Sequence, residues 1–184
     1  MTMLTRFLMG PMRPSIEAQR PVLYRIAYSW CHDPALSDDL VQETLSKAWV
    51  RRAQLREQAA LKAWMVAIMS HCWLDHLRNR HDFDDVDDLQ DTLESTVASP
   101  EACCHREQVV ACVRAAVARL PQGQRQVLTL VDLEEFSYAE VAGILEIPVG
   151  TVMSRLSRAR TSLKTMLDAA AAYSLAQPLL RRVK

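Results

Sequence analysis

The clearest hydrophobic pattern along the chain lies in two consecutive segments between Ser137 and Leu167. Ser137 and Glu140 form a capping-box sequence, which predicts the start of a helix with apolar residues at helical spacing behind it. Pro148 interrupts this pattern, because proline disfavours the helical conformation in the residue before it. The apolar residues that follow again share one face of a helix: Val152, Leu156, Ala159, Leu163 and Met166. The pattern therefore predicts two helices joined by a tight turn.

The opposite face of the second predicted helix is polar and basic. It carries Thr151, Ser154, Arg155, Arg158 and Ser162. A short helix, a turn and a longer helix with such a face form the helix-turn-helix pattern, whose second helix enters the DNA major groove. Arginine there reaches guanine edges or phosphates, and hydroxyls contact bases or phosphates. The alternative interpretation is an ordinary helical hairpin with a solvated cationic face.

Apolar residues at helical spacing predict three more helices in the part of the chain that precedes His81. The first is expected over 15–31 and ends at the sequence His32-Asp33-Pro34. Ser37 is expected to cap the second, which runs to about Arg52 and buries an apolar stripe. The third covers 61–80 and ends in a basic cluster. The stripe of the second helix consists of Leu40, Val41, Leu45 and Trp49.

Two helices are also predicted between this region and the helix-turn-helix. The first begins at Arg106 and ends near Leu120, and Pro121 starts the next. The second of these helices is expected to pack through Val127, Leu128, Val131 and Leu133. The tail from Ala169 to Lys184 is alanine-rich and then basic, and we expect it to fray.

Charge divides the chain into three blocks, although the formal net charge of the 184 residues is zero. Residues 1–80 carry 11 Lys and Arg against 7 Asp and Glu, and residues 106–184 carry the same numbers, so each block is net +4. Residues 81–105 carry 8 acidic residues and no Lys or Arg. Low hydrophobicity and high net charge are typical of a linker that cannot fold alone, so the basic blocks flank an acidic linker.

The five cysteines are odd in number and include no C-x-x-C pair. Reduced thiols in a cytoplasmic protein are therefore the expectation, and the sequence predicts no cofactor. Three histidines adjoin cysteines, in Cys31-His32, His71-Cys72 and Cys104-His105. A zinc or redox site assembled across the fold is an open alternative, although free cysteine usually behaves as a small buried hydrophobe.

These patterns predict an all-α fold of two small helical domains joined by an acidic linker. The opening segment is too short and interrupted for a secretory signal, and no run of 18 apolar residues predicts a membrane span. The second domain contains the helix-turn-helix. We expect a flexible N-terminus over 1–13, domains over 14–80 and 106–168, the linker over 81–105 and a tail over 169–184.

Three blocks, in this order with an acidic spacer, resemble the extracytoplasmic-function (ECF) sigma factors, the small initiation subunits of bacterial RNA polymerase. DDLVQETLSKAW is similar to the family's polymerase-clamp-binding helix, and LKAWMVAIMSHCWLDHLRNR to its promoter-melting helix. The block from Leu120 to Leu163 resembles the whole DNA-reading domain. The resemblance covers roughly residues 14–167 and implies a non-enzymatic subunit that lends promoter specificity to the polymerase.

The resemblance also implies site residues and partners. The helices over 106–133 would bind the polymerase flap, and the acidic linker would follow the channel that RNA later occupies. A flipped base of the −10 element would be captured at the start of the 61–80 helix, and an anti-sigma factor is the family's usual partner. The implied contacts to the −35 element are Thr151, Ser154, Arg155 and Arg158; those to the −10 element are Lys62, Trp64, His71, Arg78 and Arg80; and those to the polymerase clamp are Asp39, Leu40, Gln42, Glu43 and Thr44.

Two positions depart from the family's pattern. His71 stands where many members have asparagine, and Met153 stands where lysine is common in the recognition helix. An imidazole can hydrogen-bond and stack on a base, so His71 could replace the amide functionally. The alternative is that His71 packs against Trp30 or Trp49 and never meets DNA.

A stand-alone helix-turn-helix regulator is the competing interpretation of the whole chain. Such a regulator would use the same C-terminal domain without docking on polymerase. The first domain argues against it, because a repressor has no need of the clamp-binding and promoter-melting blocks.

Overall fold

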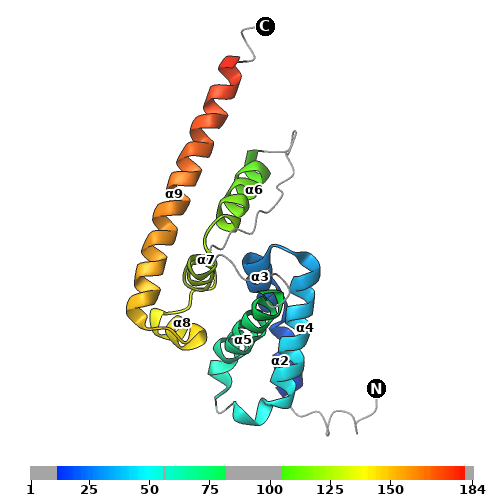
Figure 1. Cartoon of the computed structure of the whole chain (residues 1–184). Coiled ribbons are helices and arrows are strands. Elements are labelled where there is room, and N and C mark those ends of the chain that lie inside the picture. The colour runs from blue at the N-terminus through cyan, green and yellow to red at the C-terminus, as the bar shows by residue number, and fades with distance from the viewer. Residues whose placement is uncertain (1–11, 56, 82–104, 181–184) are drawn as a thin grey trace.

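The computed structural model describes residues 12–55, 57–81 and 105–180, which form helices and turns with no strand among them (Figure 1). The predicted N-terminal segment and acidic linker lie almost wholly outside these residues. The helices of the first half are α2 (Met12–Ala18), α3 (Arg20–Cys31), α4 (Pro34–Val50), η1 (Arg52–Gln54), η2 (Gln58–Ala60) and α5 (Leu61–His81). Those of the second half are α6 (His105–Ala118), α7 (Gln122–Leu128), η3 (Thr129–Leu133), α8 (Tyr138–Leu145) and α9 (Val149–Leu180).

Two boundaries in the N-terminal domain differ from the prediction. The expected first helix is broken at Gln19 into α2 and α3, because Pro21 has no N–H to donate and its ring clashes with the carbonyl four residues earlier. Asp33, not Ser37, caps α4: its Oδ1 accepts hydrogen bonds from the N–H groups of Ala35 and Leu36 at 2.8 and 3.1 Å. Ser37 lies inside the helix and is fully buried.

The N-terminal domain packs around two tryptophans. Trp30 from α3 and Trp73 from α5 are both buried, and α4 packs on both of these helices. Leu40 and Val41 of α4 are buried as predicted, whereas Leu45 and Trp49 are only partly buried, because they lie at the edge of the core beside α2. α5 therefore lies against both α3 and α4 and contributes to the core of this domain.

The C-terminal domain contains the four predicted helices. Val127 and Leu128 of α7 are buried as expected, but the prediction for Leu133 is wrong, since 61% of its surface is exposed. The reason is local: η3 is a π-helix, so the wider turn rotates Leu133 away from the core. α9 continues as a helix to Leu180, through the first part of the tail that was expected to fray, and lies beside α6 (Figure 1).

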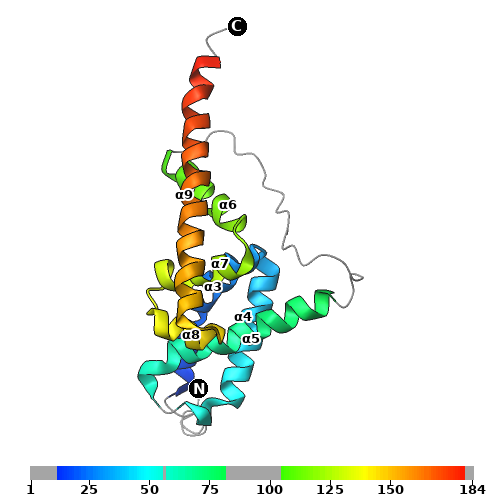
Figure 2. The ribbon, with the colours of Figure 1, turned by 60° about the vertical axis from the view of Figure 1, so that its left-hand side comes forward.

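The two domains pack directly on each other. α8 lies against α5, and α3 contacts α6, α7 and η3 (Figure 2). A single hydrophobic cluster runs through both domains, from Leu23 and Trp30 to Val127 and Leu130. No helix among the described residues is long and apolar enough to cross a membrane.

Candidate nucleic-acid interface

The turn between α8 and α9 is fixed at both ends by local contacts. The Ser137 Oγ accepts a hydrogen bond from the Glu140 N–H at 3.3 Å, and Glu140 Oε2 accepts one from the Ser137 N–H at 2.8 Å, which completes the predicted capping box. The Ser137 hydroxyl and N–H bonds lower the pKa of Glu140. Glu146 ends α8 in the left-handed conformation with φ of 53°, and Pro148 opens α9. These contacts fix the orientation of α9 relative to α8.

The polar face of α9 is accessible, as the sequence predicted. Ser154 and Arg158 are exposed, and Thr151 and Arg155 are partly exposed. Met153, on the same helix, is 54% exposed. Among the side chains of α9 that the structure describes, Val152, Leu156 and Ala159 are buried, so the apolar face is the one that packs inward.

Arg155 does not extend freely into solvent. Its guanidinium lies over Gly123 at the start of α7, so close that a Cβ at Gly123 would be 2.8 Å from Nη1. Arg160, which the sequence analysis did not single out, instead pairs with Asp132 through two hydrogen bonds of 2.6 and 3.1 Å. Arg158 makes no ion pair with the described residues. It is therefore the most accessible arginine of this face.

The α5 side chains predicted to contact the −10 element divide into two groups. Lys62 and His71 contact the C-terminal domain: Lys62 Nζ donates to the Glu134 carbonyl at 3.0 Å, and His71 Nε2 lies 3.3 Å from Glu146 Oε1. Trp64 is partly buried against the core, and Arg78 is exposed beside Asp75. The side chain of Arg80 lies outside the described part of the chain.

His71 lies at the surface of α5, facing Glu146. Its Nδ1 lies 2.9 Å from the Ala67 carbonyl oxygen of its own helix, and half of its side chain is exposed. The alternative that placed it against Trp30 or Trp49 is wrong, because Trp30 is fully buried and His71 points outward to Glu146.

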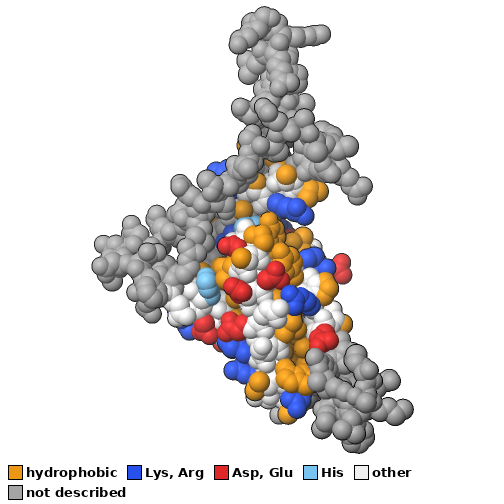
Figure 3. Space-filling model, turned by 90° about the vertical axis from the view of Figure 1, so that its right-hand side faces the viewer, with side chains coloured by type: hydrophobic (Ala, Val, Ile, Leu, Met, Phe, Trp, Pro, Cys, Tyr) orange, Lys and Arg blue, Asp and Glu red, His pale blue; other side chains and the backbone are white. Residues whose placement is uncertain are grey.

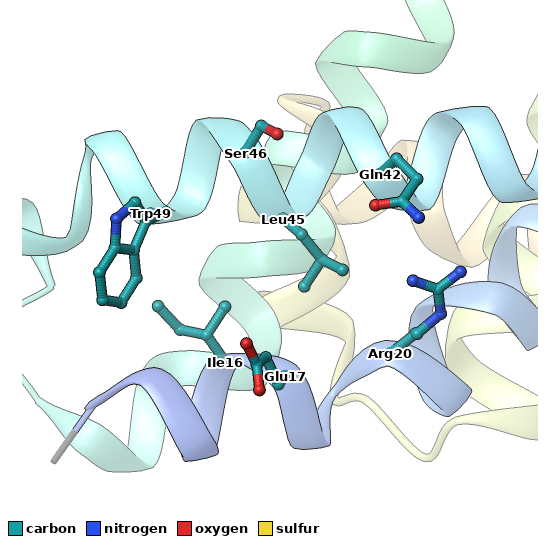
Figure 4. Close-up of a pocket in the computed structure, with 7 residues that line it drawn as sticks. All are labelled: Ile16, Glu17, Arg20, Gln42, Leu45, Ser46 and Trp49. Atoms are coloured by element: carbon teal, nitrogen blue, oxygen red, sulfur yellow. The ribbon is translucent and has the colours of Figure 1, made fainter. Parts of the chain in front are cut away.

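The predicted clamp-binding residues lie on two faces of α4. Asp39, Gln42 and Glu43 are exposed, whereas Leu40 and Thr44 are buried and Thr44 Oγ1 donates to the Leu40 carbonyl. Gln42 also borders a groove of about 550 Å³ between α2 and α4 (Figure 4). The groove is lined by Ile16, Glu17, Arg20, Gln42, Leu45, Ser46 and Trp49. An accessible surface with both apolar and polar lining is thus present beside the exposed members of the set.

The domain interface is held by a carboxylate that the sequence analysis did not identify. Glu134 accepts three hydrogen bonds of 2.8 to 3.0 Å from the Arg25 guanidinium, and its Oε2 lies 3.1 Å from Lys62 Nζ. Ser29 and Thr129 share a hydrogen bond of 2.7 Å nearby. The partners in these two contacts between α3 and the C-terminal domain lie 109 and 100 positions apart in sequence, so no local pattern could reveal them.

His32 lies at the same interface, at the C-terminal end of α3. It has φ of 54°, its ring meets Tyr28 edge to face, and its buried Nε2 has no hydrogen-bond partner in the structure. Burial, and to a smaller extent the charge of Arg125, lowers its pKa to about 4. The imidazole is therefore neutral near pH 7.

The described residues offer no support for a metal or redox site. They contain no group of three or more His, Cys, Asp or Glu side chains arranged to hold a metal ion, and Cys103 and Cys104 lie outside them. Burial raises the pKa of the Cys72 thiol, which disfavours the reactive thiolate.

The charge on the α4 side of the molecule is mixed. Figure 3 views this side and shows acidic side chains interspersed with basic and hydrophobic ones. The described residues on this side therefore offer a phosphate backbone no continuous basic surface in this view.

Comparison with known proteins identifies the family. Residues 16–83 match Sigma-70 region 2, and residues 111–163 match Sigma-70 region 4. The chain is 35% identical over 161 residues to the ECF RNA polymerase sigma factor EcfG of Rhodopseudomonas palustris, and the match covers 87% of each chain. The chain is an ECF sigma factor. It therefore belongs to the proteins that direct promoter-specific initiation of transcription.

Other relatives agree with this assignment. The RNA polymerase sigma-H factor of Pseudomonas aeruginosa is 31% identical over 159 residues, covering 82% of this ECF sigma factor and 78% of the relative. The sigma factor RpoE of Bartonella quintana, solved in complex with the anti-sigma factor NepR, superposes with a TM-score of 0.67 at 26% identity, covering 85% of this chain and 96% of that one. CnrH, solved with the cytosolic domain of CnrY, shares the fold with a TM-score of 0.58 at 24% identity, covering 84% and 85%.

Proposed function

We propose that this cytoplasmic sigma factor binds core RNA polymerase and directs it to promoters whose −35 and −10 elements it reads with α9 and α5. It acts as a specificity subunit and performs no catalysis itself. The observation that carries the proposal is the capped helix-turn-helix whose second helix presents a polar, basic face to solvent. Such a face suits the major groove, where arginine and hydroxyl groups meet base edges and phosphates.

The −35 element is assigned to Thr151, Ser154, Arg155 and Arg158. Arg158 is exposed and makes no ion pair with the described residues, whereas Arg155 lies over Gly123. We therefore assign Arg158 to direct contact with a base or phosphate. Arg155 needs only a side-chain rotation to join it.

The −10 element is assigned to α5, with Lys62, Trp64 and His71 in its first part and Arg78 and Arg80 at its basic end. An extruded base needs stacking surface and hydrogen-bonding edges, and unstacking it costs a few kcal/mol. Trp64 and His71 supply these chemical groups, and the cations hold phosphates.

Polymerase docking is assigned to the exposed residues of α4, Asp39, Gln42 and Glu43, together with the adjoining groove. Leu40 and Thr44 support this surface from within, because they are buried beneath it. The relative solved with the anti-sigma factor NepR favours a protein partner of the anti-sigma class for this chain as well.

Transcription by reconstituted holoenzyme tests the function directly. The purified chain is added to bacterial core polymerase on a library with both promoter elements randomised, and the transcripts are sequenced. We expect a defined pair of elements to be enriched only when both proteins are present. Specific duplex binding without polymerase, and no transcription with it, would favour the stand-alone regulator.

Arg158→Ala tests the recognition helix within this assay. Loss of a bidentate base contact, worth about 1–3 kcal/mol, should lower −35-dependent output roughly 5- to 150-fold. Lys164→Ala is the matched control, because Lys164 is an exposed cation six positions further along α9. Equal output from the two variants would contradict the assignment of this face.

A further inference from the structure

The domain interface contains a bidentate anion site whose cations belong to the N-terminal domain. Arg25 binds both carboxylate oxygens of Glu134, and Lys62 Nζ lies 3.1 Å from Oε2. Lys62 also lies 4.6 Å from the centre of the Phe136 ring, which fixes its ammonium group at this position. Two cations from different helices thus converge on one pair of oxygen atoms.

The three side chains of this site differ in accessibility. The Glu134 side chain is 4% exposed, whereas those of Arg25 and Lys62 are 62% and 36% exposed. The acid is therefore enclosed, while the cations lie at an open surface that another anion can reach once Glu134 leaves. Guanidinium binds carboxylate and phosphate with the same two-pronged geometry, so a phosphodiester fits where the carboxylate now lies.

A second polar contact between α5 and the C-terminal domain also pairs an α5 side chain with an acid. His71, assigned to the −10 element, meets Glu146 at 3.3 Å. Lys62, assigned to the same element, meets Glu134. Each of these two side chains on α5 is thus in contact with an acid from the C-terminal domain.

We propose that Arg25 and Lys62 form a binding site for a phosphodiester of the promoter's −10 strand, and that Glu134 occupies it in a closed conformation of the free chain. The proposal rests on the proposed function, because it takes promoter DNA as the ligand. It adds Arg25 as a DNA-contacting residue and Glu134 as an internal competitor of the DNA backbone.

Separation of the two domains would expose Arg25 and Lys62. The Glu134 carboxylate is buried and its charge is balanced by Arg25 and Lys62, so removal of that charge weakens the contact between the domains. A partner that binds the open conformation better can likewise shift the closed population. The groove between α2 and α4 has no lining residue from the C-terminal domain. Polymerase can therefore dock on the closed chain, and DNA binding follows when the C-terminal domain moves away.

Glu134→Gln in the isolated full chain tests the competitor role. It removes the charge at nearly constant shape. We expect a larger radius of gyration in X-ray scattering and at least about tenfold tighter binding of a fluorescent fork DNA with a single-stranded −10 segment. Glu135→Gln is the matched control, since it removes an equal charge from the adjacent exposed residue. It should change neither quantity.

Arg25→Gln separates a DNA site from a merely structural ion pair. It breaks the same contact from the other side, so the chain should open as in Glu134→Gln. Its affinity for the fork DNA should nevertheless not rise, because a cation of the site is missing. The double variant should lose the gain that Glu134→Gln provides. Circular dichroism verifies that each variant keeps the helical fold.

Two results would overturn the proposal. If Glu134→Gln opens the chain without tighter DNA binding, Arg25 and Lys62 are not a phosphate site. If it changes neither the size nor the affinity, Glu134 is not a competitor. Promoter-specific transcription by wild-type holoenzyme is measured in parallel, so that a failure of the proposed function is seen separately.

Discussion

At the scale of single residues, the domain interface contains charged and polar side chains in environments that are uncommon for them. Glu134 is enclosed by cations from another domain, and His32 is partly buried in the left-handed conformation with a buried, unpaired Nε2. Burying a polar atom without a partner costs free energy, and each such group in a native structure calls for an explanation. Opening of the domains would rehydrate both residues.

His32 makes stability depend on pH in a defined direction. Its pKa is about 4 in the folded chain and about 6.5 in the unfolded chain. Above pH 6.5 both states are neutral; between 6.5 and 4 only the unfolded chain takes up the proton, so the free energy of unfolding falls as pH falls. The slope stays below about 1.4 kcal/mol per pH unit, because His32 makes the two states differ by at most one bound proton.

His32→Asn removes the group that takes up this proton, and asparagine also tolerates the left-handed conformation. Urea unfolding of both proteins at pH 7 and pH 5 should show a smaller loss of stability on acidification in the variant. Between pH 7 and pH 8 the two proteins should change in parallel. Equal losses between pH 7 and pH 5 would show that His32 titrates normally.

At the scale of elements, the sequence was informative where the signals are local. The capping box and the proline-led turn depend on residues within four positions of each other, and both are present as predicted. The start of α4 was misassigned because Asp33 and Ser37 are both capping residues, and the neighbouring Pro34 favours the earlier one. The π-helix and the exposure of Leu133 have no comparable local signal.

The capping box gives a prediction for the helix-turn-helix. Ser137→Ala removes the acceptor of the Glu140 N–H and should lower the free energy of unfolding by about 1 kcal/mol. Ser157→Ala is the control, because Ser157 is exposed inside α9 and alanine has the higher helix propensity there. Urea unfolding followed by circular dichroism measures the free energy of unfolding of both variants. Equal values for Ser137→Ala and Ser157→Ala would mean that the cap contributes nothing.

At the scale of the whole molecule, the motifs predicted two sigma domains but not their mutual packing. Residues 16–83 and 111–163 carry patterns that fix each domain separately, and these regions match the family. The contact between Arg25 and Glu134 spans 109 positions of sequence, and each partner also has an ordinary interpretation as a solvated surface charge. Only the folded chain shows that Lys62 and His71, both predicted to contact the −10 element, meet acids of the other domain.

This packing predicts how the isolated chain binds DNA at different salt concentrations. In the closed conformation Arg158 is exposed and Arg155 can join it by turning away from Gly123, and the chain has no net charge to attract DNA. About two phosphate contacts give a slope of log affinity against log salt of about −2, with weak binding. Opening by Glu134→Gln frees Arg25 and Lys62 as well, and two added contacts to the single-stranded segment should steepen the slope to about −3. Titrations of the fork DNA between roughly 50 and roughly 200 mM salt measure both values. A wild-type slope as steep as that of the variant would mean that the interface cations already reach DNA in the free chain.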